Sequence, residues 1–247
     1  MNKKEFSNKT AFITGAGTGI GAATALLFAK EGADLVLVGR RKENLETTAK
    51  IASDFGSKVS IHSMDVNDNT SLKNLITSLP QLDIAVNNAG IEGALGDIIN
   101  LTSDDYDILM NTNVKSLWLC MQEQIRWMRD HQKPGHIINI SSVAGIRAFA
   151  ESSLYVGSKH AVIGISQSAA LEQIRYGIRI NVVSPGAVDT PMLSRIFSKN
   201  MDALSKAQPI KRLAQPQEIA EAIAWLSSEK SSFVVGHNLI IDGGKTI

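Results

Sequence analysis

The sequence contains almost no cysteine. Cys120 is the single cysteine among 247 residues, so the chain can form no internal disulfide framework. The five histidines stand at positions 62, 131, 136, 160 and 237, and no Cys/His cluster has the spacing of zinc ligands. We therefore expect no metal site, and we expect a reducing, cytoplasmic setting.

The sequence also has no excess of one charge and no long apolar run. Lys and Arg number 25 against 24 for Asp and Glu, which leaves a net charge of +1 and no field that would attract nucleic acid or an anionic membrane. The first residues pass from MNKKEF straight into a short β-like run, without the apolar segment of a signal peptide or a membrane span. We expect no nucleic-acid partner, no membrane insertion and no export, but a small-molecule ligand.

What is present is a regular alternation of short apolar runs and stretches with helical periodicity. The runs are rich in β-branched residues and show little in/out alternation, which is typical of parallel strands covered on both faces. Seven strands are predicted, at 10–14, 34–39, 58–64, 82–88, 135–141, 178–184 and 238–242. Helices are predicted at about 19–31, 42–55, 69–78, 103–130, 153–175 and 215–227. Right-handed crossovers then give an α/β doubly wound (Rossmann) fold, with a mainly parallel seven-stranded sheet and helices on both faces.

The chain shows no internal boundary. No Pro/Gly/Ser-rich linker or charge run divides it, so residues 1–247 are predicted to form a single domain. The stretch 187–214 has weak periodicity and carries Pro191 and Pro209. An insertion of this length fits either a mobile substrate lid or a plain surface excursion, and the sequence does not choose between them.

A glycine-rich turn follows the first predicted strand. It reads TGAGTGIG, and Gly15, Gly19 and Gly21 lead into the first predicted helix. Glycine allows a positive φ and a close backbone approach to a diphosphate, and a helix N-terminus offers unpaired N–H groups. Such a loop alone is a weak signal. Between the first strand and the first helix of an α/β pattern, it favours dinucleotide binding over a structural turn.

The spacing of this turn, together with later motifs, resembles the short-chain dehydrogenase/reductase family. The later motifs are NNAG (87–90), NTNVKSL (111–117), INISSVAG (138–145), YVGSK (155–159), SPGAVDTPM (184–192) and IDGG (241–244). Each is modest alone, but their order and spacing along essentially the whole chain are specific. The resemblance implies a nicotinamide-dependent oxidoreductase that transfers hydride between its cofactor and a secondary alcohol or ketone, and it implies a homotetramer.

The residues after the second predicted strand bear on the choice between NADP and NAD. Gly39 stands where NAD-selective members of the family usually carry Asp, and Arg40 and Arg41 follow directly. A guanidinium offers a charge-assisted fork to a 2′-phosphate, which favours NADP, although two arginines can also simply begin a solvated helix. Thr18, a position often basic in NADP-using members, is neutral here, so NAD stays possible.

The resemblance implies a longer set of cofactor contacts. Asp65 and Val66 are expected beside the adenine, and Val188 and Thr190 beside the nicotinamide carboxamide. The full set is Gly15, Thr18, Gly19, Ile20, Gly21, Arg40, Arg41, Asp65, Val66, Asn87, Ala89, Gly90, Tyr155, Lys159, Pro185, Gly186, Val188 and Thr190. Ordinary loop and turn geometry is the alternative role for several of them, especially Pro185 and Gly186.

Tyr155 and Lys159 stand four residues apart in a predicted helix, and at this spacing two side chains share one face of the helix. Hydride transfer at a carbinol needs a group that moves the hydroxyl proton. Tyrosine can do so if its pKa, about 10 when unperturbed, moves toward neutrality, and a nearby ammonium favours the phenolate. Chance pairs of this kind are common, so the spacing alone does not establish a catalytic site.

Two further residues complete the catalytic set that the resemblance implies. Ser142, thirteen residues before Tyr155 and just past the fifth strand, would hydrogen-bond the substrate oxygen, with Ser141 as the competing candidate. Asn113 would hold a water that links Lys159 to solvent, with Asn111 as the competing candidate. The catalytic prediction is therefore Asn113, Ser142, Tyr155 and Lys159.

Two other interpretations of the function stay open. The first is a 3-oxoacyl-carrier-protein reductase, for which Lys133 and Arg175 are the available basic residues at a site entrance. The second is a non-catalytic nucleotide sensor on the same fold, which an intact catalytic set disfavours. The pocket-shaping segments 91–100, 143–153 and 187–210 contain both apolar and charged residues, so the sequence does not name the substrate.

Overall fold

The computed structural model describes residues 4–198 and 200–247. In these residues one sheet of seven strands runs in the order β3-β2-β1-β4-β5-β6-β7, and every neighbouring pair is parallel. The strands are β1 (Thr10–Thr14), β2 (Asp34–Gly39), β3 (Val59–Ser63), β4 (Ile84–Asn87), β5 (Gly135–Ile140), β6 (Ile178–Pro185) and β7 (Asn238–Ile241). The doubly wound α/β fold is confirmed, and the sheet is wholly rather than mainly parallel.

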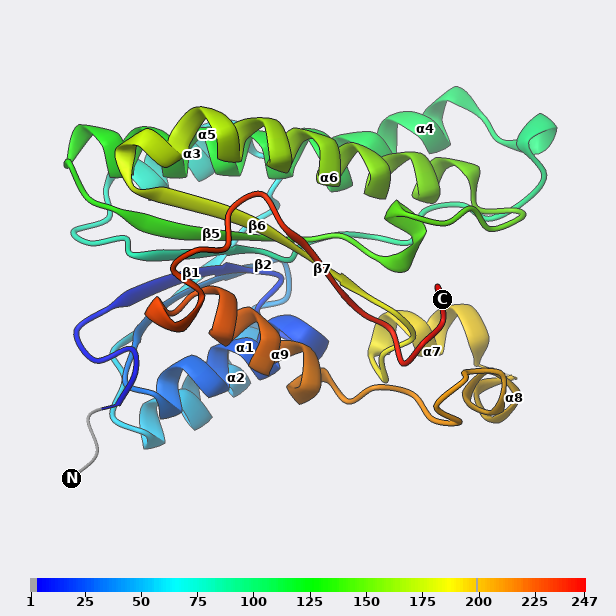
Figure 1. The fold of residues 1–247 in the computed structure, drawn as a ribbon, viewed down its shortest axis with the longest axis horizontal. Helices are drawn as coiled ribbons and strands as arrows, with labels where there is room; N and C mark the ends of the chain where they lie inside the picture. The colour runs from blue at the N-terminus through cyan, green and yellow to red at the C-terminus, as the bar shows by residue number, and fades with distance from the viewer. Residues whose placement is uncertain (1–3, 199) are drawn as a thin grey trace.

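Helices cover both faces of the sheet (Figure 1). On one face lie α3 (Asn69–Thr77), α5 (Ser116–Asp130) and α6 (Ser153–Gln173), with α4 (Ser103–Met110) packed against α6. On the other face lie α1 (Gly19–Lys30), α2 (Lys42–Asp54) and α9 (Pro216–Leu226). The strand order reverses between β1 and β4, and doubly wound sheets bind ligands at such a point.

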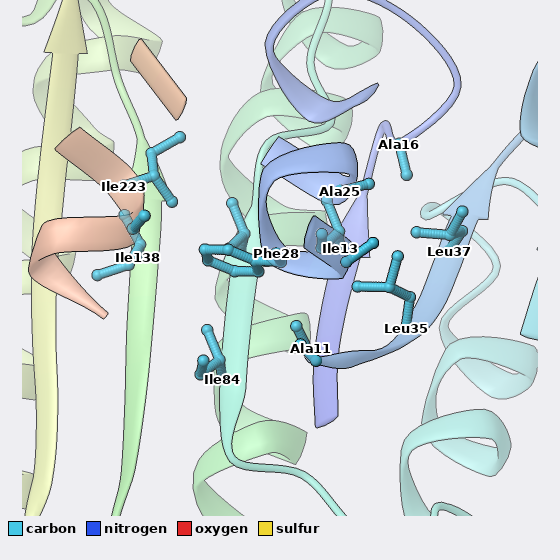
Figure 2. Packing of buried hydrophobic residues seen from close by; sticks show 14 of the residues in the cluster. Ala11, Ile13, Ala16, Ala25, Phe28, Leu35, Leu37, Ile84, Ile138 and Ile223 are labelled. Atoms are coloured by element: carbon cyan, nitrogen blue, oxygen red, sulfur yellow. The ribbon is translucent and has the colours of Figure 1, made fainter. Parts of the chain in front are cut away.

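Buried apolar side chains fill the space on both sides of the sheet. Ile13 of β1 packs in a cluster with Phe28 of α1 and Ile223 of α9 (Figure 2). Its neighbour Phe12 points the opposite way, into a cluster that includes Met128 of α5. Because both faces are covered, the strands have no solvent side, which explains their continuous apolar sequence. Full burial of a side chain such as Phe28 stabilises the fold by about 1.5–3 kcal/mol.

The long helix predicted over 103–130 is interrupted. A π-helical turn, η2 (Asn111–Lys115), separates α4 from α5. A single wider turn changes the hydrophobic periodicity too little to be visible in the sequence, and such turns are frequent at functional sites. The other short helical turns are η1 (Ile98–Asn100), η3 (Val143–Gly145), η4 (Ile174–Tyr176) and η5 (Glu229–Ser231).

The segment 187–214 contains two short helices, α7 (Pro191–Phe197) and α8 (Met201–Lys206), where no helix was predicted. Each has fewer than two full turns of apolar pattern, so periodicity could not reveal them. A parallel bridge between Val188 and Ala214 joins the two ends of the segment. Its role as a substrate lid stays a prediction.

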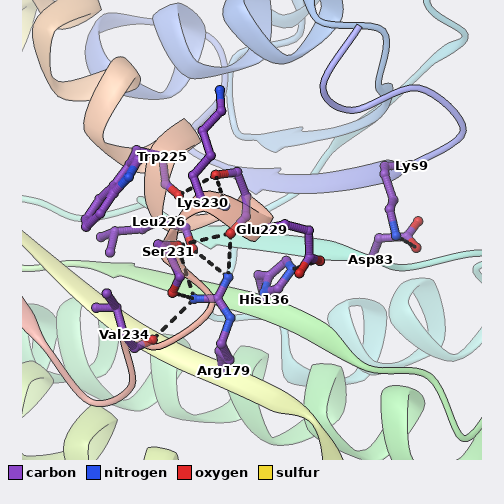
Figure 3. Close-up of polar contacts among 11 residues, drawn as sticks. Lys9, Asp83, His136, Arg179, Trp225, Leu226, Glu229, Lys230, Ser231 and Val234 are labelled. Carbon is purple, nitrogen blue, oxygen red and sulfur yellow. Dashed lines mark hydrogen bonds and ion pairs between the residues drawn. The ribbon is translucent and has the colours of Figure 1, made fainter. Parts of the chain in front are cut away.

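A polar cluster lies at the amino ends of β5 and β6 (Figure 3). The guanidinium of Arg179, only 6% exposed, donates hydrogen bonds to the backbone carbonyls of Ser228 and Ser231, both at 2.9 Å. Nε2 of His136 lies 3.9 Å from the carboxylate of Glu229. Burial, with the nearby charge of Arg179, lowers the pKa of His136 to about 4. The cluster fixes the connection from α9 to β7, at the sheet edge opposite the glycine turn.

Cys120 is buried on α5, and this burial raises the pKa of its thiol to about 12, which leaves it unreactive at neutral pH. No described helix combines the length and the apolar character that crossing a bilayer requires. Among the same residues, no three His, Cys, Asp or Glu side chains come together as metal ligands.

Candidate active site

The glycine turn is braced against the end of β4. The Thr14 hydroxyl accepts hydrogen bonds from the backbone N–H groups of Asn88 and Ala89, each at 3.0 Å. The side-chain amide of Asn88 donates in return to the carbonyls of Thr14 and Gly15, at 3.1 and 3.2 Å. These contacts hold the carboxyl ends of the two central strands together, where the strand order reverses.

The turn itself has no room for side chains. Gly15 and Gly19 adopt φ values of +66° and +55°, in the left-handed region that favours glycine. A Cβ on Gly21 would overlap the carbonyl oxygen of Gly15, and one on Gly19 would lie 3.0 Å from Cγ2 of Thr190. The turn therefore presents bare backbone to whatever approaches it, and Thr190 closes over it from the start of α7.

A cavity of about 650 Å³ opens beside this turn at the carboxyl edge of the sheet. The glycine turn, the loops that follow β2, β3 and β4, and the start of α7 line it. Of the residues expected to bind a cofactor, the lining contains Gly15, Thr18, Gly19, Ile20, Arg40, Arg41, Asp65, Val66, Ala89, Gly90 and Thr190. Residues from four separate loops thus meet in one cavity, as their expected shared ligand requires.

Several expected cofactor residues lie outside that lining. The buried side chain of Asn87 donates hydrogen bonds to Gln124 of α5 and to Asn139 of β5, both at 2.9 Å. Pro185 ends β6, and Gly186 packs so closely on Asp242 that a Cβ would lie 2.8 Å from its Cα. Four more residues of the expected set lie outside the lining: Gly21, Val188, Tyr155 and Lys159. Val188 instead forms the parallel bridge with Ala214.

Other residues line the cavity that the sequence did not single out. Asn88 is one of them, and strand alternation could have identified it, because Asn87 and Asn88 must point to opposite faces. Asn44, Glu92 and Arg195 also belong to the lining. Arg195 comes from α7, so no local pattern connects it with the glycine turn.

The two arginines after β2 are both exposed and both line the cavity. Nη2 of Arg41 donates to the hydroxyl of Thr18 at 3.4 Å, which links the end of β2 to the glycine turn. The carboxylate of Asp65 accepts the backbone N–H of Asn67 at 2.9 Å, so it does act as a turn residue while lining the cavity. The basic groups and the glycine turn therefore share one space.

Tyr155 and Lys159 lie on the same face of α6. Nζ of Lys159 is 5.7 Å from the centre of the Tyr155 ring and donates to the carbonyl of Ile140 at 3.0 Å. A Cβ on Gly90 would lie 3.7 Å from this Nζ and 3.2 Å from Oδ1 of Asn113. Gly90 thus connects the cavity to two of the predicted catalytic side chains, Lys159 and Asn113.

The pKa of Tyr155 differs from the expectation. Burial raises it, the Ser142 hydroxyl lowers it by hydrogen bonding, and the negative charge of Glu92 raises it further, so it lies above its ordinary value. The ammonium of Lys159 donates to the backbone carbonyl of Ile140. Burial lowers the pKa of Lys159 itself to about 8.

The two adjacent serines have different partners. The hydroxyl of Ser141 donates to the backbone carbonyl of Lys159 at 2.9 Å and is buried. Ser142 begins the turn η3, where its Oγ accepts the backbone N–H of Ala144 at 3.1 Å, and it is close enough to Tyr155 to lower the pKa of the tyrosine hydroxyl. Only Ser142 is therefore placed to share a ligand atom with Tyr155.

Asn113 is buried within the π turn, whereas Asn111 is exposed. Its Oδ1 accepts the backbone N–H of Ile91 at 2.8 Å, and its Nδ2 donates to the Ile91 carbonyl at 2.9 Å and to Ser158 Oγ at 3.3 Å. The side chain thus fixes the loop after β4 against the helix. The two hydrogens of Nδ2 are used in this way, whereas Oδ1 can accept a second hydrogen bond, so the water expected at Asn113 stays a prediction.

Comparison with known proteins places this geometry in context. A family model described as "Enoyl-(Acyl carrier protein) reductase" matches residues 15–246. A curated protein named A-factor type gamma-butyrolactone 1′-reductase (1S-forming), from Streptomyces virginiae, is 39% identical over 249 residues and covers 98% of this chain and 96% of its own. A 3-oxoacyl-(acyl-carrier-protein) reductase from Thermotoga maritima is 36% identical over 244 residues, covering 97% and 98%.

Solved structures give the same result over the full length. Levodione reductase superposes with a TM-score of 0.92 at 33% identity, covering 97% of this chain and 98% of that one. Carveol dehydrogenase from Mycobacterium avium, solved with NAD, gives 0.92 at 26% identity, covering 98% and 99%. An actinorhodin polyketide ketoreductase, solved with NADPH, gives 0.91 at 29% identity, covering 96% of each chain.

Proposed function

The chain belongs to the short-chain dehydrogenase/reductase family, an oxidoreductase family acting on alcohol and ketone groups, and we propose that it interconverts a secondary alcohol and its ketone with a nicotinamide dinucleotide. One observation carries this proposal. The side chain of Ser142 is close enough to Tyr155 to lower the pKa of the tyrosine hydroxyl, the Lys159 ammonium lies 5.7 Å from the centre of the Tyr155 ring, and Gly90 connects this ammonium with the glycine-lined cavity.

The residues present fit a dinucleotide. The side-chain-free turn at Gly15 and Gly19 lets a diphosphate approach backbone N–H groups, and Gly90 keeps the other end of the cavity open beside Lys159. When bound there, the nicotinamide ring supplies or accepts the hydride. This chain's own residues bind and orient the two reactants and move the proton.

We propose NADP as the preferred cofactor. Arg40 and Arg41 line the cavity, and Gly39 places no carboxylate beside them that would repel a 2′-phosphate. Among the solved relatives, one contains NAD and another NADPH, so family membership supports either cofactor. The arginines are the feature of this chain that favours the phosphorylated form.

In the reducing direction, Tyr155 donates its hydroxyl proton to the substrate oxygen while Ser142 hydrogen-bonds the same atom. Because burial holds the pKa of Tyr155 above its ordinary value, the hydroxyl is protonated at neutral pH, as a proton donor must be. The phenolate left behind is stabilised by the Ser142 hydroxyl and by the positive charge of Lys159. Lys159, packed beside the Asn113 turn, would then return a proton through water.

The interpretation as a carrier-protein reductase loses part of its sequence support. Lys133 precedes β5 and Arg175 precedes β6, so both lie at the amino edge of the sheet. Ser142 and the cavity lie at the carboxyl edge, on the opposite side. These two residues cannot form a docking patch at the site entrance. The second candidate substrate is still a 3-oxoacyl group on a carrier protein, because the chain is similar to a 3-oxoacyl-(acyl-carrier-protein) reductase.

We also propose that the protein forms a homotetramer. Trp118 of α5 and Leu171 of α6 are 44% and 79% exposed, and Phe233, just before β7, is fully exposed. Apolar side chains of this size on two separate faces fit two kinds of subunit contact. Sedimentation velocity with wild-type protein tests this, and a monomer at micromolar concentration would contradict it.

The experiment for the reaction is a panel of ketones and secondary alcohols followed by the absorbance of NADPH or NADH. Wild type is expected to turn over members of the panel, and Tyr155→Phe is expected to lose that turnover while still binding the cofactor. Equal turnover by both proteins would remove Tyr155 from the mechanism.

A further inference from the structure

An ion pair spans the cavity beside the predicted catalytic residues. Nε of Arg195 donates to Oε1 of Glu92 at 3.0 Å, and Nη2 donates to Oε2 at 3.1 Å. This is the parallel fork in which a guanidinium binds a carboxylate most strongly. Glu92 lies on the loop after β4 and Arg195 on α7, so the pair joins two segments that are 103 residues apart.

Each member of the pair lies in a different environment. The side chain of Glu92 is 23% exposed and that of Arg195 is 54% exposed. Desolvation raises the pKa of the Glu92 carboxyl, but the side-chain hydrogen bonds from Arg195, a backbone hydrogen bond and the charge of Arg195 together hold it below the ordinary value. The pair is therefore ionised at neutral pH, with the carboxylate as its deeper member.

The position of the pair connects it to the substrate. Both residues line the cavity together with Gly90, which is adjacent to Lys159 and Asn113. The negative charge of Glu92 is also close enough to Tyr155 to raise the pKa of the tyrosine hydroxyl. A substrate whose oxygen meets Tyr155 thus has its other groups within the field of Glu92 and Arg195.

The loops around this end of the cavity expose several large apolar side chains beside the charged residues Asp97, Arg147 and Glu151. Ile98 of the β4–α4 loop is 67% exposed, and Ile146 and Phe149 of the loop after β5 are 37% and 36% exposed. The two loops touch, because the backbone N–H of Gly96 donates to the carbonyl of Glu151 at 2.9 Å. An uncharged, largely apolar compound fits such surroundings.

Building on the proposed function, we propose that Glu92 and Arg195 determine substrate charge: with the guanidinium already paired, the site accepts uncharged ketones and disfavours those that carry a carboxylate. Arg195 is the cationic group that would bind a substrate carboxylate, and Glu92 occupies its fork. The Glu92 carboxylate also repels a second anion directly. Removing the charge of Glu92 should release Arg195 for the substrate.

The test compares a neutral ketone with an anionic one of the same skeleton, methyl 4-oxocyclohexanecarboxylate and 4-oxocyclohexanecarboxylate. Glu92→Gln is expected to lower the KM for the acid about tenfold relative to wild type, with the KM for the ester changed less than about twofold, because a charge-assisted hydrogen bond is gained for the acid alone. Arg195→Gln should raise the KM for the acid, since it leaves the carboxylate of Glu92 unpaired.

Asp202→Asn is the matched control. It breaks the ion pair of Asp202 with Lys206, which lies on α8 of the same insertion but outside the cavity. Its ratio of KM values for acid and ester should equal that of wild type. If the ratio of KM values for acid and ester is the same in wild type, Glu92→Gln and Arg195→Gln, the proposal is overturned. A wild-type preference for the acid over the ester would also overturn it.

Binding measured by equilibrium dialysis separates this proposal from the proposed reaction. Glu92→Gln should bind the labelled acid about tenfold more tightly than wild type, whether or not either ketone is reduced. If wild type turns over no member of the ketone and alcohol panel, the proposed reaction is wrong. The dialysis result then still decides whether the ion pair discriminates against the acid. Unchanged binding of the acid overturns that role.

Discussion

Nζ of Lys159 lies 5.7 Å from the centre of the Tyr155 ring, one helical turn below it. The ammonium donates to the carbonyl of Ile140 rather than to the phenolic oxygen. In this state burial dominates the ionisation of both groups, because it raises the pKa of Tyr155 and lowers that of Lys159 to about 8. The free enzyme therefore holds a protonated tyrosine, ready to donate.

Tyr155→Phe removes the proton donor and keeps the ring. We expect kcat for ketone reduction to fall by about 100-fold or more, the usual contribution of a positioned acid or base. The dissociation constant of NADPH, measured by fluorescence titration, should stay within about threefold of wild type. Tyr106→Phe, which alters an exposed tyrosine on α4, is the control and should leave both values unchanged.

The ionisation of Lys159 should be visible in the pH profile. Since its pKa is lowered to about 8, the ammonium is present below that pH and is lost above it. We expect kcat/KM, which reports free-enzyme groups, to decline as pH rises through about 8. A profile for ketone reduction that stays flat from neutral pH to well above 8 would show that the charge of Lys159 is not needed.

Arg40→Ala tests the cofactor preference. Loss of a charge-assisted contact with the 2′-phosphate should weaken NADPH binding by about tenfold or more, while NADH binding should hardly change. Lys42→Ala, at an exposed cation on α2 outside the cavity lining, is the matched control. Equal losses for the two cofactors would rule out phosphate recognition by Arg40.

Gly21→Ala tests the packing of the glycine turn. The added methyl group would overlap the carbonyl of Gly15, so the turn must shift. We expect an unfolding free energy lower by about 1–3 kcal/mol, measured with urea, together with weaker dinucleotide binding. Gly164→Ala, on an exposed part of α6 where a Cβ meets nothing, should instead stabilise the protein by about 0.5–1 kcal/mol.

His136 should make stability depend on pH. Its pKa is about 4 in the folded protein against 6.5 for an unperturbed histidine, so between these values the unfolded chain binds more protons. Its contribution to the unfolding free energy is complete above pH 6.5 and is lost as pH falls toward 4, by up to about 3 kcal/mol. His136→Asn should flatten this part of the urea-measured profile, whereas His160→Asn, at an exposed position on α6, should not.

The fold could be predicted from the sequence because its main signals are local. A strand such as 34–39 is buried on both faces, so four consecutive apolar residues, 35–38, mark it without any tertiary information. The glycine turn follows from φ requirements at Gly15 and Gly19, which are also local. The interruption of the helix over 103–130 has no local signal, because it depends on Asn113 bonding to Ile91, a loop residue 22 positions away.

The site could be predicted only in part, for the same physical reason. The structure engages Ser141 with the carbonyl of Lys159 and leaves Asn111 exposed, while the catalytic roles of Ser142 and Asn113 stay predictions. The orientation of Asn87 depends on partners in α5 and β5, and the pairing of Glu92 with Arg195 depends on how the insertion folds back. Contacts of this kind are set by packing and cannot be deduced from motif spacing.

The bridge between Val188 and Ala214 has an evolutionary consequence. Its flanking hydrogen bonds, from Asp189 N to the Ala214 carbonyl at 2.9 Å and from Ala214 N to the Ala187 carbonyl at 3.0 Å, pin the two ends of the insertion side by side. We therefore expect changes in the residues between these two ends to alter the cavity, which Thr190 and Arg195 line, more than the sheet.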